Sequence, residues 1–395
     1  MKNTILFALA VSLTSSGAAA ADVRQVENPV KDSYIVVLKE GVARPGRAPS
    51  GAGLSVEAVA RELLRLHGGA LARVYENALS GFNVRMSAAL AAAVARDPRV
   101  AYVEQDGEVR LVVTQANATW GIDRIDQRQR PLSGTFSYTN TGAGVRAYII
   151  DTGIRFSHTE FGGRAVSGFD AVDGGSANDC NGHGTHVAGT VGGTTYGLAK
   201  QVTLVAVRVL GCQGAGSTAG VIAGVDWVTG DHAPGAPAVA NMSLGGGASS
   251  SLDSAVANSI ADGVSYAVAA GNGNLLGIAQ SACRYSPSRV PAAITVSATT
   301  RTDAKASFAN YGSCVDGFAP GVGITSAWAT SDTATNTISG TSMATPHVTG
   351  VAALYLQSNP AATPEQLGIA LYEKSTKGVV TNARSAKNNL LFTDY

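Results

Sequence analysis

The sequence predicts an α/β protein with a doubly wound, mostly parallel sheet, preceded by a small ferredoxin-like α+β domain. From about Thr114 onward, continuous apolar runs such as "GVRAYIID", "VTLVAVRVL", "PAVANMSL" and "VSYAVAAGN" alternate with helical stretches. Runs without polar alternation are typical of strands buried on both faces of a parallel sheet. Before that point, the elements follow the different order β-α-β-β-α-β.

The N-terminal domain follows from periodicity. "SYIVVLK" reads as a strand, and "SVEAVARELLRLH" places Val56, Val59, Leu63 and Leu66 at helical spacing. "ARVYENAL" and "GFNVRMS" read as two strands, "AALAAAVARD" as a helix that stops at Pro98, and "RVAYVEQD" as a last strand. This order matches the ferredoxin-like unit.

Residues 1–21 read as a secretory signal. Lys2 precedes the apolar run "TILFALAVSL", and "GAAAA" offers cleavage sites near Ala20 or Ala21. The alternative, a membrane anchor, is disfavoured because the run is too short to span a bilayer. The net charge of +1 favours neither nucleic acid nor an anionic membrane. We therefore expect a secreted, monomeric protein with no membrane anchor and no nucleic-acid partner.

Four cysteines suit an exported protein with disulfides, and four cysteines allow three pairings. We favour the local pairing, Cys180–Cys212 with Cys283–Cys314, although spacing alone leaves the other two open.

Polar residues end three of the predicted strands: Asp151 ends "RAYIID", Ser243 ends "PAVANMS" and Asn272 ends "VSYAVAAGN". Ligands of a doubly wound sheet collect at the carboxyl ends of its strands. We therefore expect these side chains to border a binding cleft.

Two of the six histidines share the motif "CNGHGTHVAG". We expect His183, flanked by glycines, to face the cleft and His186 to pack against the core. A competing interpretation is a zinc site, because Cys180, His183 and His186 supply three zinc-type ligands at short spacing. We expect His347 to be structural inside a helix, and His158 and His232 to lie at the surface.

Asp151, His183 and Ser342 carry the side chains of nucleophilic catalysis. A serine hydroxyl is a weak nucleophile until a neutral imidazole takes its proton, and a buried carboxylate must orient that imidazole. Ser342 stands where a loop gives way to a long apolar helix, Ser342 to about Leu356, so a helix cap is the simpler alternative.

Five motifs decide between these alternatives: "YIIDTGI", "NGHGTHVAGT", "NMSLGGG", "AVAAGN" and "SGTSMATPHVTGVAALY". Together and in this order they resemble the subtilase family of serine proteases, within it the proteinase K branch and its aqualysin-like members. The resemblance runs from about Trp120 to the C-terminus, and residues 31–109 resemble the inhibitor-type propeptide of these proteases. An esterase is disfavoured because no "GxSxG" elbow surrounds Ser342.

The resemblance implies a secreted endopeptidase made as a self-processed zymogen: signal peptide 1–21, propeptide 22–113 and peptidase domain 114–395. The propeptide would act as intramolecular inhibitor and folding aid, with "EVRLVVTQ" running into the cleft. Cleavage is expected between about Arg110 and Asn117. A catalytically dead, subtilase-shaped binding protein would have lost one of the key residues, and none is lost.

The resemblance also implies residue roles. Asp151 would orient His183, the general base, Ser342 would be the nucleophile, and Asn272 would donate to the oxyanion. Polypeptide substrates would lie extended between two glycine-rich edges and fill an apolar S1 pocket near the stretch after Cys283. The expected substrate-binding residues are Gly214, Ala215, Gly216, Ser243, Leu244, Gly245, Ala269 and Gly271.

Structural Ca²⁺ is also implied, since calcium prefers several oxygen ligands. One site would use Asp316 with the carbonyls of Pro291 and Ala293. A second would use Asp123, Asp126 and Gln127, and a third Asp170, Asp173 and Asp179. For the last two, a solvated acidic loop is the alternative.

Overall fold

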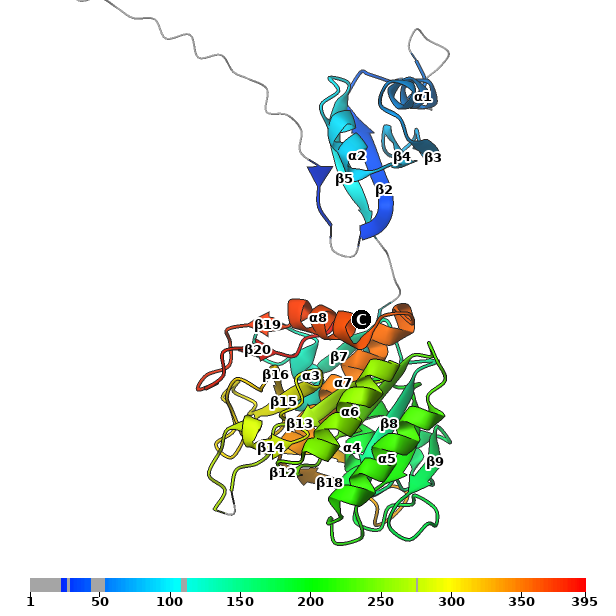
Figure 1. Ribbon diagram of the computed structural model, residues 1–395. Coiled ribbons are helices and arrows are strands. Elements are labelled where there is room, and N and C mark those ends of the chain that lie inside the picture. Colours follow the sequence, from blue (N-terminus) through cyan, green and yellow to red (C-terminus); the bar gives the residue numbers. More distant parts are fainter. Residues whose placement is uncertain (1–22, 27–28, 44–53, 108–111, 275) are drawn as a thin grey trace, which may run out of the picture. The chain divides into compact units, whose positions relative to one another are not determined.

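The computed structural model of the chain describes residues 23–26, 29–43, 54–107, 112–274 and 276–395. The chain divides into two compact units, Met1–Arg110 and Leu111–Tyr395 (Figure 1). The predicted signal segment 1–21 lies outside the described residues. Within the described residues, no helix is long and apolar enough to cross a membrane.

The first unit has the predicted ferredoxin-like order. Its sheet runs β1-β5-β2-β4-β3, with two helices packed on it. The helix α1 begins after Ser55, whose hydroxyl accepts a hydrogen bond from Ala58 N, and it ends at Gly68. The elements are β1 Val23–Arg24, β2 Pro29–Leu38, α1 Val56–His67, β3 Ala70–Tyr75, β4 Gly81–Arg85, α2 Ala88–Ala95 and β5 Val100–Gly107.

The second unit is built on a nine-stranded sheet in the order β19-β20-β16-β15-β13-β11-β8-β10-β9. Neighbouring strands run parallel except at the β19–β20 edge, as a doubly wound fold requires. The strands are β8 Arg146–Asp151, β9 Ala165–Asp170, β10 Thr203–Arg208, β11 Ala238–Met242, β13 Ser265–Ala269, β15 Ile294–Thr299, β16 Gly317–Pro320, β19 Thr376–Lys377 and β20 Asn389–Leu390.

Helices cover both faces of this sheet. The strand β8 shows the division: Ala147 and Ile149 join the core under α4 (His183–Gly192) and α7 (Thr341–Ser358). Tyr148 and Ile150 join the core under α5 (Thr218–Asp231) and α6 (Ser250–Asp262). Alternate side chains of a strand point to opposite faces, so both faces must be apolar.

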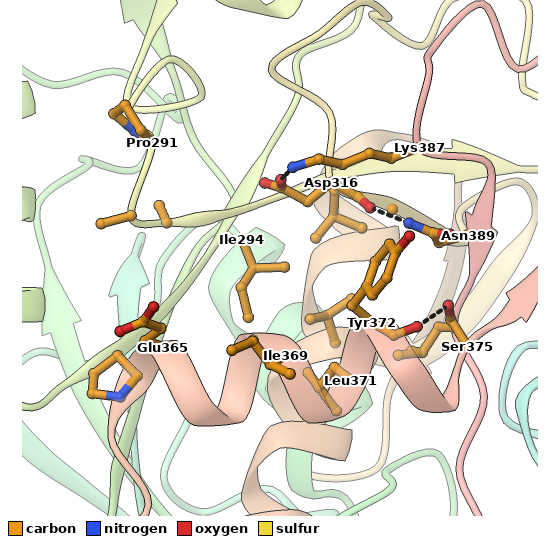
Figure 2. A pocket seen from close by; sticks show the side chains of 18 of the residues that line it. Pro291, Ile294, Asp316, Glu365, Ile369, Leu371, Tyr372, Ser375, Lys387 and Asn389 are labelled. Atoms are coloured by element: carbon orange, nitrogen blue, oxygen red, sulfur yellow. Dashed lines mark hydrogen bonds and ion pairs between the residues drawn. The ribbon is translucent and has the colours of Figure 1, made fainter.

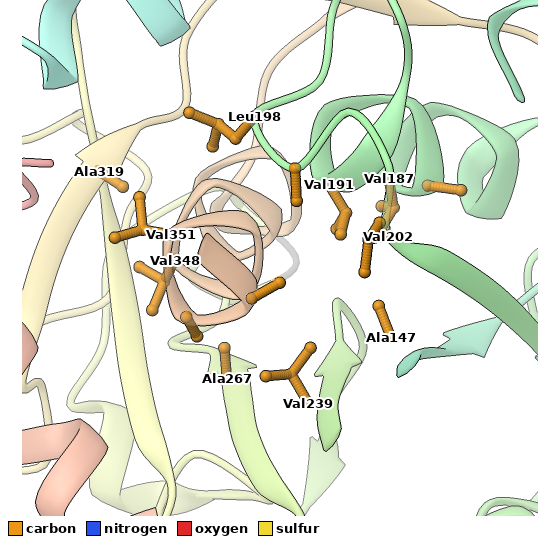
Figure 3. Packing of buried hydrophobic residues seen from close by; sticks show 14 of the residues in the cluster. Ala147, Val187, Val191, Leu198, Val202, Val239, Ala267, Ala319, Val348 and Val351 are labelled. Carbon is orange, nitrogen blue, oxygen red and sulfur yellow. The ribbon is translucent and has the colours of Figure 1, made fainter. Parts of the chain in front are cut away.

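The helix α7 lies in the interior of the second unit. Figure 3 shows its Val348 and Val351 in the apolar cluster that also contains Val239 and Ala267 of the sheet and Val191 of α4. The remaining helices are α3 Trp120–Ile125 and α8 Pro364–Lys374, with 3₁₀ turns at Thr159–Phe161 and Ala282–Arg284. The remaining strands form two-stranded sheets: β6 Val113–Ala116 with β7 Thr135–Tyr138, β12 Gly246–Gly247 with β14 Tyr285–Ser286, and β17 Ile324–Ala327 with β18 Thr335–Ile338.

The strand β6 corrects one expectation. The stretch "EVRLVVTQ" was expected to run into the cleft as the end of the propeptide. Its last residues instead pair with β7 inside the second unit. The Gln115 side chain anchors the pairing by donating to Thr195 O and accepting from the Lys200 ammonium. Residues 108–111 lie outside the described residues.

Both favoured disulfides are present, Cys180–Cys212 and Cys283–Cys314.

The expectation that His158 and His232 lie at the surface was wrong, because they are 2% and 6% exposed. Each ring satisfies both nitrogens inside the fold. The ring of His158 contacts Glu160 N and Ala334 O, and that of His232 contacts Asp262 and Ala236 O. Neither partner set could be recognised from the sequence.

Candidate active site

The three polar strand ends lie at one edge of the sheet. The strands β8, β11 and β13 are neighbours; Asp151 is the last residue of β8, and Ser243 and Asn272 follow the carboxyl ends of β11 and β13. Parallel strands all present their carboxyl ends on the same side, so residues distant in sequence meet there. This is the arrangement that the sequence predicts.

A hydrogen bond joins Asp151 to His183. The ring Nδ1 lies 2.7 Å from Asp151 Oδ1, which also accepts from Thr152 N at 2.8 Å. The carboxylate is fully buried, and the imidazole side chain is 26% exposed. Burial acts to lower the pKa of His183, but the charge and hydrogen bond of Asp151, together with the charge of Asp179, raise that pKa above its ordinary value.

Asp179 holds the start of α4, the helix on which His183 is the first residue. Its two carboxylate oxygens accept from the backbone N–H groups of Asn181, Gly182 and Thr185, and from the hydroxyls of Thr152 and Thr185. An anion at a helix N-terminus satisfies free N–H groups and interacts favourably with the helix dipole. Asp179 therefore positions the backbone that carries His183.

The predicted third calcium set is consequently wrong. Asp179 is occupied by five protein donors, while Asp170 and Asp173 both pair with the Arg208 guanidinium at 2.8 and 2.9 Å. The alternative of a solvated acidic loop is also wrong for Asp170 and Asp179, because both are buried. An acidic residue four positions before His183 was a possible sign of helix capping, and the sequence analysis missed it.

Ser342 is the second residue of α7, after Thr341 and the N-cap Gly340. It is therefore inside the first helical turn and is not the cap. Its Oγ donates to the carbonyl of Ser243 at 3.0 Å, and the Ser243 hydroxyl donates to the Ser342 carbonyl at 2.7 Å. This reciprocal pair attaches the start of α7 to the end of β11.

Thr341 fixes the orientation of the Asn272 side-chain amide. Its backbone N–H and its hydroxyl both donate to Asn272 Oδ1, at 2.8 and 3.0 Å. Because an amide has its oxygen and nitrogen on opposite sides, this leaves the Asn272 NH₂ group to donate elsewhere. The sequence analysis did not single out Thr341, and no local pattern marks a threonine for this role.

A cavity of about 390 Å³ adjoins His183. It contains six of the eight residues expected to bind substrate. The other two lie outside it: Ala269 is buried in β13, and Gly271 N donates to the Thr341 hydroxyl. The lining consists of Thr152, Asn181, His183, Leu210, Gly214, Ala215, Gly216, Ser217, Thr218, Val221, Ser243, Leu244, Gly245, Gly246, Gly247 and Leu252.

The structure excludes a zinc site formed by Cys180, His183 and His186. Cys180 is in a disulfide, and the fully buried His186 directs its Nε2 to Ile324 O at 3.0 Å. Burial lowers the pKa of His186 to about 4, so its ring is neutral and structural. The prediction that His186 packs in the core is confirmed, as is the structural role of His347, whose Nδ1 contacts Met343 O.

Two predicted calcium sets can be tested for fit. Asp123 and Gln127 each accept a hydrogen bond from Ser133 N, and Asp126 Oδ1 is buried with no hydrogen-bond partner among the described residues. Burial, followed by the charge of Asp123, raises the pKa of Asp126 to about 6. Both oxygens of Asp123 accept hydrogen bonds from the Ser133–Gly134 segment, so Asp126 Oδ1 is the oxygen of this set that fits a hard cation.

The Asp316 set does not fit. Its Oδ1 is 2.6 Å from the Lys387 ammonium, and its Oδ2 accepts from Thr295 N at 2.9 Å. Both carboxylate oxygens are therefore already bonded within the protein. Across the described residues, no group of three or more Asp, Glu, His or Cys side chains is placed to hold a metal.

Fold and site together define a class of protein. A doubly wound sheet carries a buried carboxylate–imidazole pair, and a serine in the first turn of a helix is bonded to Ser243, which lines the same cavity as His183. These are the side chains that a serine hydrolase uses. Comparison with known families agrees: residues 142–392 match the subtilase family, and residues 33–112 match the peptidase inhibitor I9 family. The chain belongs to the subtilase family and is a serine proteinase with an inhibitor-type propeptide domain.

Several known proteins are similar over most of the chain. An extracellular serine proteinase of Thermus sp. (strain Rt41A) is 55% identical across 99% of this chain and 98% of its own. Alkaline serine exoprotease A of Vibrio alginolyticus is 50% identical across 92% of this chain and 68% of its own. The crystal structure of a cold adapted subtilisin-like serine proteinase matches 70% of this chain and 98% of its own, with 55% identity and a TM-score of 0.67. The protein is accordingly a secreted subtilase.

Proposed function

We propose that Asp151, His183 and Ser342 form the catalytic triad of a peptide-bond hydrolase, and that Asn272 and the backbone N–H of Ser342 form its oxyanion hole. The single observation that carries the proposal is the 2.7 Å bond between His183 Nδ1 and the buried Asp151 carboxylate. That bond selects the tautomer in which His183 Nε2 carries a lone pair and can accept a proton.

The chemistry begins with a rotation of the Ser342 side chain away from the Ser243 carbonyl. His183 Nε2 then takes the hydroxyl proton while Oγ attacks the substrate carbonyl carbon, and the carbonyl π electrons move onto its oxygen. The imidazolium returns the proton to the departing amine, which leaves an acyl-enzyme. A water molecule, deprotonated by His183, releases the acid product and restores Ser342.

The oxyanion receives two kinds of support. The N–H groups at the N-terminus of α7 are free of intrahelical partners and carry partial positive charge. Asn272, oriented by Thr341, adds a side-chain donor. Negative charge develops on the substrate oxygen only as the tetrahedral intermediate forms, so these donors stabilise the transition state more than the ground state.

The substrate is a polypeptide bound in extended form between the Gly214–Gly216 and Ser243–Gly246 segments. Both segments line the 390 Å³ cavity beside His183. A strand-like peptide can pair with exposed backbone on each side, and glycine allows close approach. The small uncharged residues Ser243 and Gly245, which line this cavity, favour apolar P1 side chains, and this preference remains a prediction.

The domain boundaries and processing also remain predictions: signal 1–21, propeptide 22–113 and peptidase 114–395, with self-cleavage between about Arg110 and Asn117. A purified Ser342→Ala precursor should stay uncut, as judged by its mass. Processing of this variant in isolation would show that another nucleophile performs the cleavage.

We also propose that Asp123, Asp126 and Gln127 hold a structural Ca²⁺, which would neutralise the carboxylates there.

Labelling by a sulfonyl fluoride tests the triad. The reagent should abolish peptidase activity and add one sulfonyl group to Ser342, located by peptide mass analysis. Ser339 provides the matched control, because it lies in the same segment and its Oγ accepts from Gly323 N. Ser339→Ala should keep activity and labelling, whereas Ser342→Ala should lose both. Labelling at another serine with loss of activity would overturn the assignment.

A further inference from the structure

Asp316 lies at the start of β16 and joins three parts of the second unit. Its backbone N–H donates to Thr295 O, its Oδ2 accepts from Thr295 N, and its carbonyl accepts from the Asn389 side chain. One carboxylate oxygen, Oδ1, is left over. The residue is thus a junction between β15, β16 and the C-terminal segment, and its remaining charge needs a cation.

Lys387 supplies a positive charge at that oxygen. Its Nζ lies 2.6 Å from Asp316 Oδ1, and Figure 2 shows the side chain reaching across one end of a cavity of about 620 Å³. The backbone around Lys387 holds it there: Gly378 N donates to Asn388 O, and Asn388 exchanges two side-chain hydrogen bonds with Val380. These bonds fix the backbone from which the half-exposed Lys387 side chain reaches Asp316.

We propose that the Lys387 ammonium is the resident cation of Asp316, so that this chain joins its C-terminal segment to the sheet without the calcium ion expected at that residue. The loop Pro291–Ala293, which was expected to complete a calcium site, lines the same cavity as Asp316 and Lys387 (Figure 2). The disagreement between the expected ion and the observed side chain is the basis of the proposal.

The chemistry opposes calcium at this position. Calcium takes six to eight oxygen ligands at roughly 2.3–2.6 Å, and Asp316 offers one oxygen already bonded to an N–H group and one bonded to an ammonium. An incoming ion would have to displace Lys387 and then bind beside a like charge. The Asp123, Asp126 and Gln127 set differs, because no ion pair of its carboxylates occurs within the described part of the chain and Asp126 Oδ1 is an orphaned carboxylate oxygen.

Calcium titration of the full-length Ser342→Ala chain, which cannot digest itself, provides the test. Isothermal titration calorimetry would count the bound ions in four forms: the parent, Lys387→Met, Asp316→Asn and Lys387→Met/Asp316→Asn. We expect Lys387→Met to bind one calcium ion more than the parent, at a position where the parent binds none. The double variant should lose this gain, and Asp316→Asn alone should bind as many ions as the parent.

Thermal unfolding gives a second readout. In a chelator, Lys387→Met should melt below the parent, and added calcium should restore it by more than it raises the parent. Lys374 is the matched control, because it also forms a 2.6 Å pair, with Asp394. Lys374→Met should gain no ion. Two outcomes would overturn the proposal: Asp316→Asn binds one ion fewer than the parent, or Lys387→Met binds no additional ion. The Asp316→Asn measurement does not depend on how the lysine variant folds.

Discussion

Thr341 donates two hydrogen bonds to one oxygen of Asn272, from its backbone N–H at 2.8 Å and from its hydroxyl at 3.0 Å. Thr341 is fully buried, and its hydroxyl also accepts from Gly271 N. The residue before the proposed nucleophile thus orients the proposed oxyanion donor. The same helical turn thus carries Ser342 and orients the second donor of the proposed oxyanion hole.

Replacing Thr341 by valine should lower kcat about tenfold with little change in KM. The variant keeps the backbone N–H bond but loses the hydroxyl bond, so the Asn272 amide is held less firmly. Full removal of the donor in Asn272→Ala should cost roughly 10²–10³ in kcat, a range that comes from subtilisin, a member of the same family. Thr341→Ser, which retains the hydroxyl, should behave like the parent; equal losses in the serine and valine variants would contradict this role.

Replacing Asp179 by asparagine should move the acidic limb of the kcat/KM profile to lower pH. His183 must be neutral to act as a base, so activity is lost as pH falls through its raised pKa. The negative charge of Asp179 contributes to that rise, after Asp151, and its removal lowers the pKa of His183. A pH series with a peptide substrate measures the limb. Asp226→Asn, at an exposed helical position, is the control and should leave the limb in place.

Breaking the Cys180–Cys212 disulfide should affect both stability and substrate binding. The bond closes a loop with a sequence separation of 32 residues, and loss of such a loop constraint costs about 2–4 kcal/mol. Cys212 O also accepts from the Asn181 side-chain Nδ2, and Asn181 Oδ1 accepts from His183 N. The pair Cys180→Ala/Cys212→Ala should therefore raise KM as well as lower Tm.

The second disulfide is the control for that experiment. The Cys283–Cys314 bond has nearly the same sequence separation, 31 residues, whereas it is Cys212 of the first disulfide that bonds the cavity-lining Asn181. Cys283→Ala/Cys314→Ala should lower Tm comparably and leave KM near the parent value. A comparable rise of KM in both double variants would mean that the effect on binding is a general consequence of destabilisation.

Calcium dependence at Asp126 should change with pH. Without the ion, burial raises the folded-state pKa of Asp126 to about 6, above the ordinary value of 3.8 for an aspartate, so the protonated form stabilises the fold at low pH. This contribution is complete below about pH 4 and is lost as pH rises through 6. Added calcium should raise the Tm of the Ser342→Ala chain more at pH 7.5 than at pH 4.5.

The variant Asp126→Asn checks the cause. Its neutral amide should make the unfolding temperature in a chelator fall less between pH 4.5 and 7.5 than in the parent. The same variant should gain less from calcium at pH 7.5. An unchanged response to both pH and calcium would show that Asp126 neither titrates in this range nor binds the ion.

Much of the site could be predicted from the sequence because its residues belong to strongly marked local patterns. Asp151, Ser243 and Asn272 end buried apolar strands, and His183 stands in a glycine-flanked motif at the start of a helix. Parallel topology then requires those strand ends to meet. The residues that support them have no such signal: Thr341 and Asp179 act through hydrogen bonds to backbone and side chains that only folding brings near.

By itself, the sequence determined the two-domain organisation, the doubly wound sheet and the set of residues available for catalysis, because apolar periodicity and motif spacing depend on neighbours along the chain. Only the tertiary structure decided which charges are already paired. Asp316 and Lys387 are 71 positions apart in the sequence, and Asp170 and Arg208 are 38 positions apart. Nothing in the local sequence distinguishes a carboxylate that is paired in this way from one that binds a metal. Electrostatic partners are set by distance in space, so the ion pairs could be recognised only after the chain was folded.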